Sequence, residues 1–253
     1  MALNLPLPKQ ILSHPHWTLG QKKLSKSTGI IVNPFWAIDR FEVDPLRFFL
    51  MLEGGFIDDS AYDNALVART YKWRLQNGIG NLLRRVVASK KMWKVSEVVK
   101  VAEQRKDFDW AGADIGRWYK TIDGLRDRMD VQMKALDIRA AVQQAVAGAN
   151  AGDQLLQHNA PWLMFKSEDA AIRERGIMVV FLTAELLRIV GILLQPVMPG
   201  KMTRLLDQLG VDPERRRFQD AVIGVDYTYG TPMEDLQLSK GADSGLFPPI
   251  TID

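Results

Sequence analysis

Cysteine is absent from the 253 residues of this chain, and histidine occurs only three times. The absence of cysteine excludes a disulfide scaffold, a cysteine-based zinc finger and an iron–sulfur site. Net charge is also small, because 33 Lys and Arg residues stand against 30 Asp and Glu residues. The hydrophobic fraction of 47% excludes a disordered acidic tail and is sufficient for the core of one large domain or two smaller ones.

Long uncharged apolar runs are scarce as well. The most apolar stretch, residues 177–194, carries Glu185 and Arg188 near its middle. Each of these charges would cost about 2.5–3.5 kcal/mol at the centre of a bilayer. We therefore expect a buried core helix here and no membrane partner. The first ten residues contain two prolines and no basic region, which predicts neither a signal peptide nor an amphipathic transit sequence.

Positive charge is concentrated in one part of the chain. Between Arg69 and Lys106, eleven Lys and Arg residues occur with only two acidic residues. Trp73 and Trp93 lie in the same stretch. A solvated helix face is one interpretation, but the scarcity of acidic partners favours a surface that binds nucleic acid.

The secondary-structure pattern changes near residue 60. Residues 10–59 are mixed, with short strands predicted at 11–14 and 29–32. A helix is predicted to begin at Ser60, with Tyr62, Leu66, Trp73 and Ile79 at helix-face spacing. Further helices are predicted at 114–133, at the alanine-rich 137–158, from a cap at Ser167 to before Pro196, and from Pro199 to Gly210. Short connections predict an antiparallel bundle, followed by an extended tail from Arg216.

The most distinctive chemical feature is a lysine-rich segment at residues 20–29, called here the lysine loop. It carries Lys22, Lys23 and Lys26, and such cations suit a phosphate that gains charge in a transition state. A Walker A loop is excluded because Ser25 occupies its second glycine and the apolar run 30–32 follows instead of a helix. A solvated basic turn remains an alternative on this evidence alone.

Several motifs resemble one family. The segment Lys23-Leu24-Ser25-Lys26-Ser27 resembles the KMSKS signature of class I aminoacyl-tRNA synthetases, and its setting is similar to that in methionyl-tRNA synthetases, especially mitochondrial ones. The other matching segments follow in order along the chain: Asp44-Pro45-Leu46-Arg47, residues 79–85, Asn159-Ala160-Pro161-Trp162 with Lys166, residues 194–199 and residues 245–249.

The resemblance implies a mostly α fold with three parts. Residues 1–59 would be the C-terminal end of a Rossmann-like class I catalytic domain, with the KMSKS-like loop and a stem-contact region. Residues 60–215 would be an α-helical anticodon-binding domain. Residues 216–253 would be an extended tail that packs back on it.

The resemblance also implies an activity, that of a methionine–tRNA ligase. Such an enzyme uses ATP with Mg²⁺ to convert methionine to methionyl-adenylate and transfers the methionyl group to tRNA(Met). Lys26 and Lys23 would be catalytic, and Leu24, Ser25 and Ser27 would complete the ATP-binding loop. Leu24 replaces the usual methionine, and Thr28-Gly29-Ile30 departs from the common pattern. We expect no protein-bound metal, a monomer, and a place in the mitochondrial matrix, with the cytoplasm as the alternative.

Three residues are implied as anticodon readers: Asn81, Arg85 and Trp162. Asn81 and Arg85 are four positions apart and so project from one helix face. Trp162 offers a ring on which an unstacked base can stack. Taken without the resemblance, Asn81 could be a packing residue, Arg85 a solvated cation and Trp162 a core side chain.

Two further features bear on function. His14 and His16 lack a third ligand nearby, so we expect hydrogen-bonding roles at a strand end and not a metal pair. Only 22 residues precede Lys23, and no H-x-G-H pattern occurs. We therefore expect a C-terminal portion of a synthetase that binds tRNA but does not catalyse pyrophosphate exchange alone. The alternatives are a non-catalytic tRNA-binding helical module and another class I synthetase for an apolar amino acid.

Overall fold

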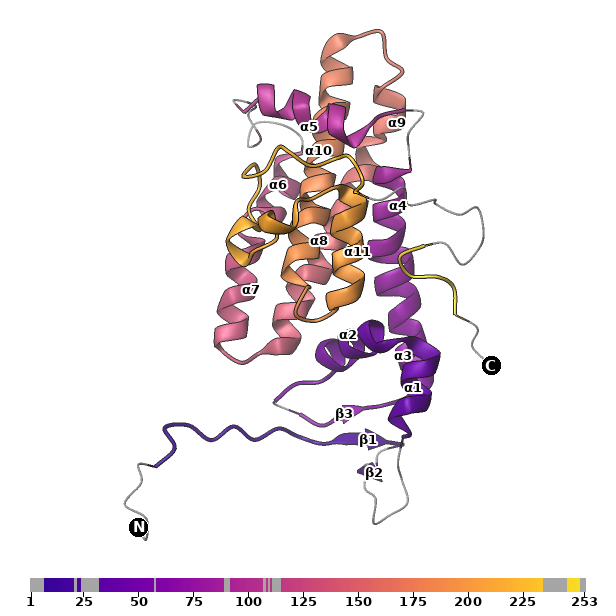
Figure 1. Ribbon diagram of the computed structural model, residues 1–253, viewed down its shortest axis with the longest axis vertical. Coiled ribbons are helices and arrows are strands. Elements are labelled where there is room, and N and C mark those ends of the chain that lie inside the picture. Colours follow the sequence, from indigo (N-terminus) through magenta and orange to yellow (C-terminus); the bar gives the residue numbers. More distant parts are fainter. Residues whose placement is uncertain are drawn as a thin grey trace.

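The structure of the chain is a computed structural model, shown in Figure 1. It describes residues 7–20, 22–23, 32–56, 58–88, 92–106, 108, 110, 115–233 and 245–250. Helices dominate this part of the chain, and the mostly α architecture is as predicted from the sequence.

A small sheet and two helices form one end of the molecule. Strand β1 (Trp17–Leu19) lies between β2 (Lys22–Lys23), which is antiparallel to it, and β3 (Ser60–Ala61), which is parallel. Helices α1 (Pro34–Phe41) and α2 (Val43–Glu53) follow the lysine loop. Asn33 caps α1, because its Oδ1 accepts the backbone N–H of Phe35 at 3.0 Å. A separate apolar cluster, which includes Phe41, Phe49 and Tyr62, holds this end together.

A long helix leads from this end into the bundle. It consists of α3 (Asn64–Thr70), the π-helical stretch η2 (Tyr71–Gly80) and α4 (Asn81–Val87). The backbone is right-handed helical at both junctions, so the three elements form one continuous rod. Asp63 caps it through a 2.7 Å bond from Ala65 N–H. In Figure 1 the rod runs along one side of the molecule, from the sheet towards α9 (Pro161–Met164).

Two long helices form the centre of the bundle. They are α8 (Ile138–Asn159) and α10 (Ala170–Leu193), which pack against each other over much of their length. The close approach requires glycine, because a Cβ at Gly152 would lie 2.3 Å from the Leu186 side chain. The surrounding helices are α5 (Val95–Gln104), α6 (Gly116–Ile122), α7 (Leu125–Lys134) and α11 (Pro199–Leu209).

The structure corrects several predicted element boundaries. The predicted strand at 11–14 is absent, and β1 begins only at Trp17, whereas residues 29–31 of the other predicted strand lie outside the described residues. Ser60 lies in β3 and donates its hydroxyl to Glu53 O at 2.9 Å instead of capping a helix. The predicted helix 114–133 is divided, because Gly124 adopts a left-handed φ of 69° between α6 and α7. Asp169, not Ser167, caps α10. Helices α1, α2 and α5 were not predicted.

Two of the segments named above for their resemblance contact each other. Arg47 of α2 donates from Nε to Val197 O at 3.0 Å and from Nη2 to Pro196 O at 2.7 Å. Asp44 accepts the backbone N–H of Lys201 at 2.6 Å. These bonds hold α2 on the turn before α11 and thereby fix the sheet end of the molecule against the bundle.

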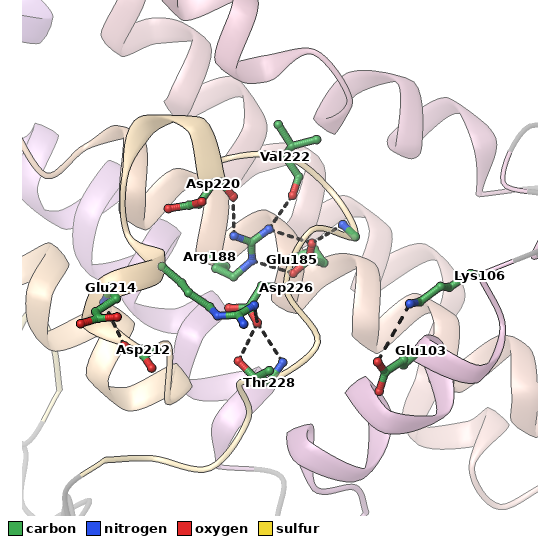
Figure 2. A network of polar contacts seen from close by, with 12 residues as sticks. Glu103, Lys106, Glu185, Arg188, Asp212, Glu214, Asp220, Val222, Asp226 and Thr228 are labelled. Atoms are coloured by element: carbon green, nitrogen blue, oxygen red, sulfur yellow. Dashed lines mark hydrogen bonds and ion pairs between the residues drawn. The ribbon is translucent and has the colours of Figure 1, made fainter.

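A buried ion pair lies in the middle of α10 (Figure 2). Glu185 and Arg188 are both fully buried, and their side chains meet at 2.7 Å and 2.9 Å. Arg188 also donates to the backbone carbonyls of Asp220 and Val222, each at 2.6 Å. Within the described part of the chain, α10 is the one helix long and apolar enough to cross a membrane. However, 94% of its apolar window is buried inside the protein. It is the core helix that residues 177–194 predict.

Candidate nucleic-acid interface

The basic stretch 69–106 is partly neutralised by acids from other elements. Arg85 pairs with Asp153 of α8, and Arg105 pairs with Glu174 of α10. Lys94 and Lys106 pair with the two acids inside the stretch itself, Glu97 and Glu103. A count of charges within residues 69–106 therefore overestimates the free positive charge of this stretch, because the fold brings the carboxylates of Asp153 and Glu174 to its arginines.

The two tryptophans of this stretch have opposite environments. Trp93 is 7% exposed, and its indole N–H donates to Val86 O at 3.0 Å, so it belongs to the core. Trp73 is 62% exposed, although its spacing predicted a position on the buried face. The π-helical stretch accounts for this difference, since its wider turn shifts which positions face the core.

Arg85 and Trp162, both predicted as anticodon readers, lie together in the structure. The guanidinium carbon of Arg85 is 5.6 Å from the ring centroid of Trp162, within the range of a cation–π interaction. Arg85 is further held by Asp153, whose Oδ1 accepts from Nη1 at 2.6 Å. Both Arg85 and Trp162 are half-buried. A planar cation and an aromatic ring are thus fixed side by side at the surface of the bundle.

Asn81 lies one turn before Arg85 on the same helix. Its Oδ1 accepts a hydrogen bond from Nη2 of Arg84 at 3.1 Å, and it is half-buried. The structure therefore joins Arg85 to Trp162 and places Asn81 nearby on α4, four residues earlier. An amide, a guanidinium and an indole can bind a nucleotide by base-edge hydrogen bonds, phosphate contacts and stacking.

The loop between α8 and α9 positions Trp162. Ala160 adopts a left-handed conformation with φ 44° and ends α8, and Pro161 begins α9. Asn159 fixes this corner, because its Nδ2 donates to Leu155 O at 2.9 Å and its Oδ1 accepts from Arg175 at 3.2 Å. The corner reverses the chain so that Trp162 reaches Arg85. Asp153 was missed from the sequence, because nothing marks one acid inside a long helix as the partner of a distant arginine.

Most of the lysine loop lies outside the described residues. Of its predicted ATP-binding residues, only the backbone of Lys23 is described, paired with Thr18 in the sheet. Leu24, Ser25, Lys26 and Ser27 lie outside that part. At the base of the loop, the backbone N–H of His16 donates to Asp59 at 2.8 Å, and Nδ1 of His14 bonds to Pro15 O. Among the described residues no group of three or more His, Asp or Glu could hold a metal ion.

Two family models match the chain. One, described as tRNA synthetases class I (M), matches residues 1–87, and the other, the anticodon binding domain of methionyl tRNA ligase, matches residues 110–225. With the helical bundle, these matches define a chain of the class I aminoacyl-tRNA synthetases. Relatives from Neurospora crassa and Schizosaccharomyces pombe, both named probable mitochondrial methionine–tRNA ligases, are 38% and 33% identical over 100% and 87% of this chain. The chain belongs to the methionyl-tRNA synthetase family.

Solved structures agree with this assignment. The apo Mycobacterium tuberculosis methionyl-tRNA synthetase superposes with a TM-score of 0.77 at 26% identity, over 98% of this chain and 45% of that one. The same enzyme in complex with methionyl-adenylate has a TM-score of 0.77 at 28% identity, over 97% of this chain and 45% of that one. The chain spans 40% and 39% of the lengths of the Neurospora and Schizosaccharomyces relatives.

Proposed function

We propose that this chain acts in methionine–tRNA ligation and recognises the anticodon of tRNA(Met). The family assignment supports the reaction, and one observation supports the recognition step. This observation is the 5.6 Å approach of Arg85 to Trp162, which joins a residue of the first matched range to one of the second. Two separately predicted reading residues are thereby brought into one site.

The proposed reaction begins with activation of methionine. ATP, bound as its magnesium complex, is attacked at the α-phosphate by the carboxylate of methionine, which gives methionyl-adenylate and releases pyrophosphate. Lys26 and Lys23 would stabilise the charge that develops on the phosphates, and Leu24, Ser25 and Ser27 would shape the loop. Transfer of the methionyl group to tRNA(Met) follows. The name of the Mycobacterium complex with methionyl-adenylate supports this intermediate.

Recognition would use three different kinds of contact. The indole of Trp162 would stack on an unpaired anticodon base, which is typically worth about 1–3 kcal/mol. Asn81 would donate to and accept from a base edge, and Arg85 would bind a phosphate or a base through its planar fork. Asp153 holds the guanidinium in place before the RNA arrives. The names of the two fungal relatives support a mitochondrial place of action. A monomer is the simplest form of the chain consistent with this proposal.

The experiment is a measurement of the affinity of the full chain for the isolated anticodon stem-loop of tRNA(Met). Trp162→Ala is expected to raise Kd about tenfold or more, because a stacking surface is lost. Trp162→Phe keeps an aromatic ring and should retain most of the affinity. Trp36→Ala is the matched control, since it removes a 43% exposed tryptophan from α1. An unchanged Kd for Trp162→Ala would remove the basis of the proposal.

A second candidate function is tRNA binding without catalysis. It is favoured by the second family match, the anticodon binding domain over residues 110–225, whose description concerns RNA alone. Pyrophosphate exchange by this chain does not separate the two functions, because we expect none from this portion alone under either of them. The sequence encoded in frame before these residues separates them: an H-x-G-H pattern there supports the ligase, and a coding sequence without one supports the binding module.

A further inference from the structure

Trp73 is the most exposed of the seven tryptophans of the chain, all of which lie among the described residues. It projects from η2, the middle of the long helix, and is 62% exposed. One exposed apolar side chain does not by itself mark a binding surface, so the groups around Trp73 decide its meaning.

The neighbours of Trp73 are cationic. Arg69, Lys72 and Arg74 are all exposed, and Lys72 Nζ lies 6.0 Å from the Trp73 ring centroid. Among the described residues, none of these three cations takes part in an ion pair within 4.0 Å, whereas Arg85, Lys94, Arg105 and Lys106 of the same basic stretch do. Three of the cations without an ion pair in the described part of this stretch thus lie within four positions of one exposed aromatic ring, and Arg84 and Lys100 are the other two.

The cluster is continuous with the candidate anticodon site. Trp73, Asn77, Asn81 and Arg85 follow one another at intervals of four residues on an unbroken helix. An interval of four keeps side chains near one face, both in an α-helix and in a wider π-helical turn. At about 1.5 Å per residue, Trp73 is at most about 18 Å from Arg85 along the axis. The helix runs from the reading site towards the sheet end, where β2 enters the lysine loop (Figure 1).

We propose that Trp73, Arg69, Lys72 and Arg74 form a second RNA contact, which binds the sugar–phosphate backbone next to the anticodon independently of base sequence. This inference rests on the proposed function. The cations bind phosphates, and the indole packs on a ribose or base face with its N–H available to a phosphate oxygen. A nucleic acid matches this combination of aromatic and unpaired cationic groups, because every nucleotide offers both an apolar face and a negative charge.

The test measures Kd of the full chain for two stem-loops, one with the methionine anticodon CAU and one with an altered triplet. Trp73→Ala is expected to weaken binding of both RNAs about tenfold and by the same factor. Lys72→Gln is expected to reduce the slope of log K against log salt concentration by about 0.7–0.9. Both residues are exposed, so the variants should fold as the parent does.

Two matched controls lie on other helices. Val131→Ala removes an equally exposed apolar side chain from α7, and Lys120→Gln removes an exposed charge from α6. Neither change should affect RNA affinity or its salt dependence. A loss equal to that of Trp73→Ala in these controls would overturn the inference, because the effect would then not be local.

The remaining outcomes separate this inference from the proposed function. If the chain binds the CAU stem-loop and Trp162→Ala weakens it, but Trp73→Ala changes Kd less than twofold, only the second contact is wrong. A loss confined to the CAU stem-loop would also overturn it, since the contact would then read bases. A change in oligomeric state without loss of RNA affinity would assign the surface to a protein partner instead. No RNA binding at all would overturn both proposals.

Discussion

Arg188 carries a full positive charge in the centre of the protein, with 0% of its surface exposed. Burial alone would lower the pKa of its guanidinium, but the charge and hydrogen bonds of Glu185, together with smaller effects of Tyr229 and Asp226, more than offset this and raise the pKa above its ordinary value. Glu185 in turn accepts the backbone N–H of Gly224 at 2.7 Å. The pair therefore connects the core helix to the chain that follows α11, because both charges are satisfied only when residues 220–224 are in place.

Loss of one partner of this pair should be costly. Arg188→Met leaves the Glu185 carboxylate buried without its cation and is expected to lower the free energy of unfolding by about 3–5 kcal/mol. Urea denaturation measures this loss. The double variant Glu185→Leu/Arg188→Leu is the control and should recover part of the stability, because it leaves no unpaired charge. A loss below about 1 kcal/mol for Arg188→Met would be typical of an exposed pair and would contradict the account.

The sequence predicted part of this arrangement. Two charges in the middle of an apolar run indicated a core helix and not a membrane span, which agrees with the buried α10 of the structure. Their partners could not be predicted. Arg188 donates to the backbone carbonyls of residues 220 and 222, and because every residue has a carbonyl, the sequence does not show which ones lie beside it.

At the scale of elements, the packing of α8 on α10 depends on glycine in the middle of a helix. Gly148 and Gly152 are one turn apart on α8, and both face Leu186 of α10. Glycine costs about 1 kcal/mol in a helix interior relative to alanine, so its presence here reflects the closeness of the two helices. The resulting contact sets the position of α8, which carries Asp153 and ends at the corner before Trp162.

Gly152→Ala tests this contact. The new Cβ would lie 2.3 Å from Cδ2 of Leu186 and 3.0 Å from Cδ2 of Leu82, so the helices must separate or the leucines must leave their rotamers. We expect a decrease of about 1–3 kcal/mol in the free energy of unfolding, despite the better helix propensity of alanine. Asn150→Ala, at an exposed position of the same helix, should change stability by less than about 0.5 kcal/mol. A Gly152→Ala chain as stable as the parent would contradict the close packing.

The sequence predicted helix limits well only where residues that mark a helix end are present. Helices α8 and α11 begin and end within about two residues of their predicted limits, because Asp137, Pro199 and Gly210 are strong terminus signals. Helices α6 and α7 were predicted as one, since the apolar spacing continues across Gly124 while the backbone turns there. The π-helical η2 could not be predicted either, and it placed Trp73 outside instead of in the core.

At the scale of the whole molecule, the long helix connects the sheet end to the end that carries the proposed anticodon site. It begins beside the sheet that leads into the lysine loop and ends where Arg85 meets Trp162. The bonds from Asp44 and Arg47 to the segment before α11 and its first turn hold the sheet end to the bundle. The spacing between β1, at the base of the lysine loop, and the proposed anticodon site is thus fixed by helices and not by a linker.

The candidate site was predicted only through resemblance. Asn81 and Arg85 share a helix face by their spacing of four, but no periodicity relates them to Trp162, which lies 77 positions after Arg85. The fold brings the last two together through the left-handed corner at Ala160, a conformation that alanine rarely adopts and that composition does not reveal. Their roles as readers remain a prediction, as do those of Lys23, Leu24, Ser25, Lys26 and Ser27.

The central claim is that this chain recognises the methionine anticodon through the Arg85–Trp162 site. The most direct test is the ratio of Kd values of the full chain for the stem-loop with the CAU triplet and for one in which a single anticodon base is changed. The account predicts at least about tenfold weaker binding of the altered RNA, equivalent to about 1.4 kcal/mol, and loss of this ratio in Trp162→Ala. Equal affinity of the unaltered chain for both RNAs would contradict it.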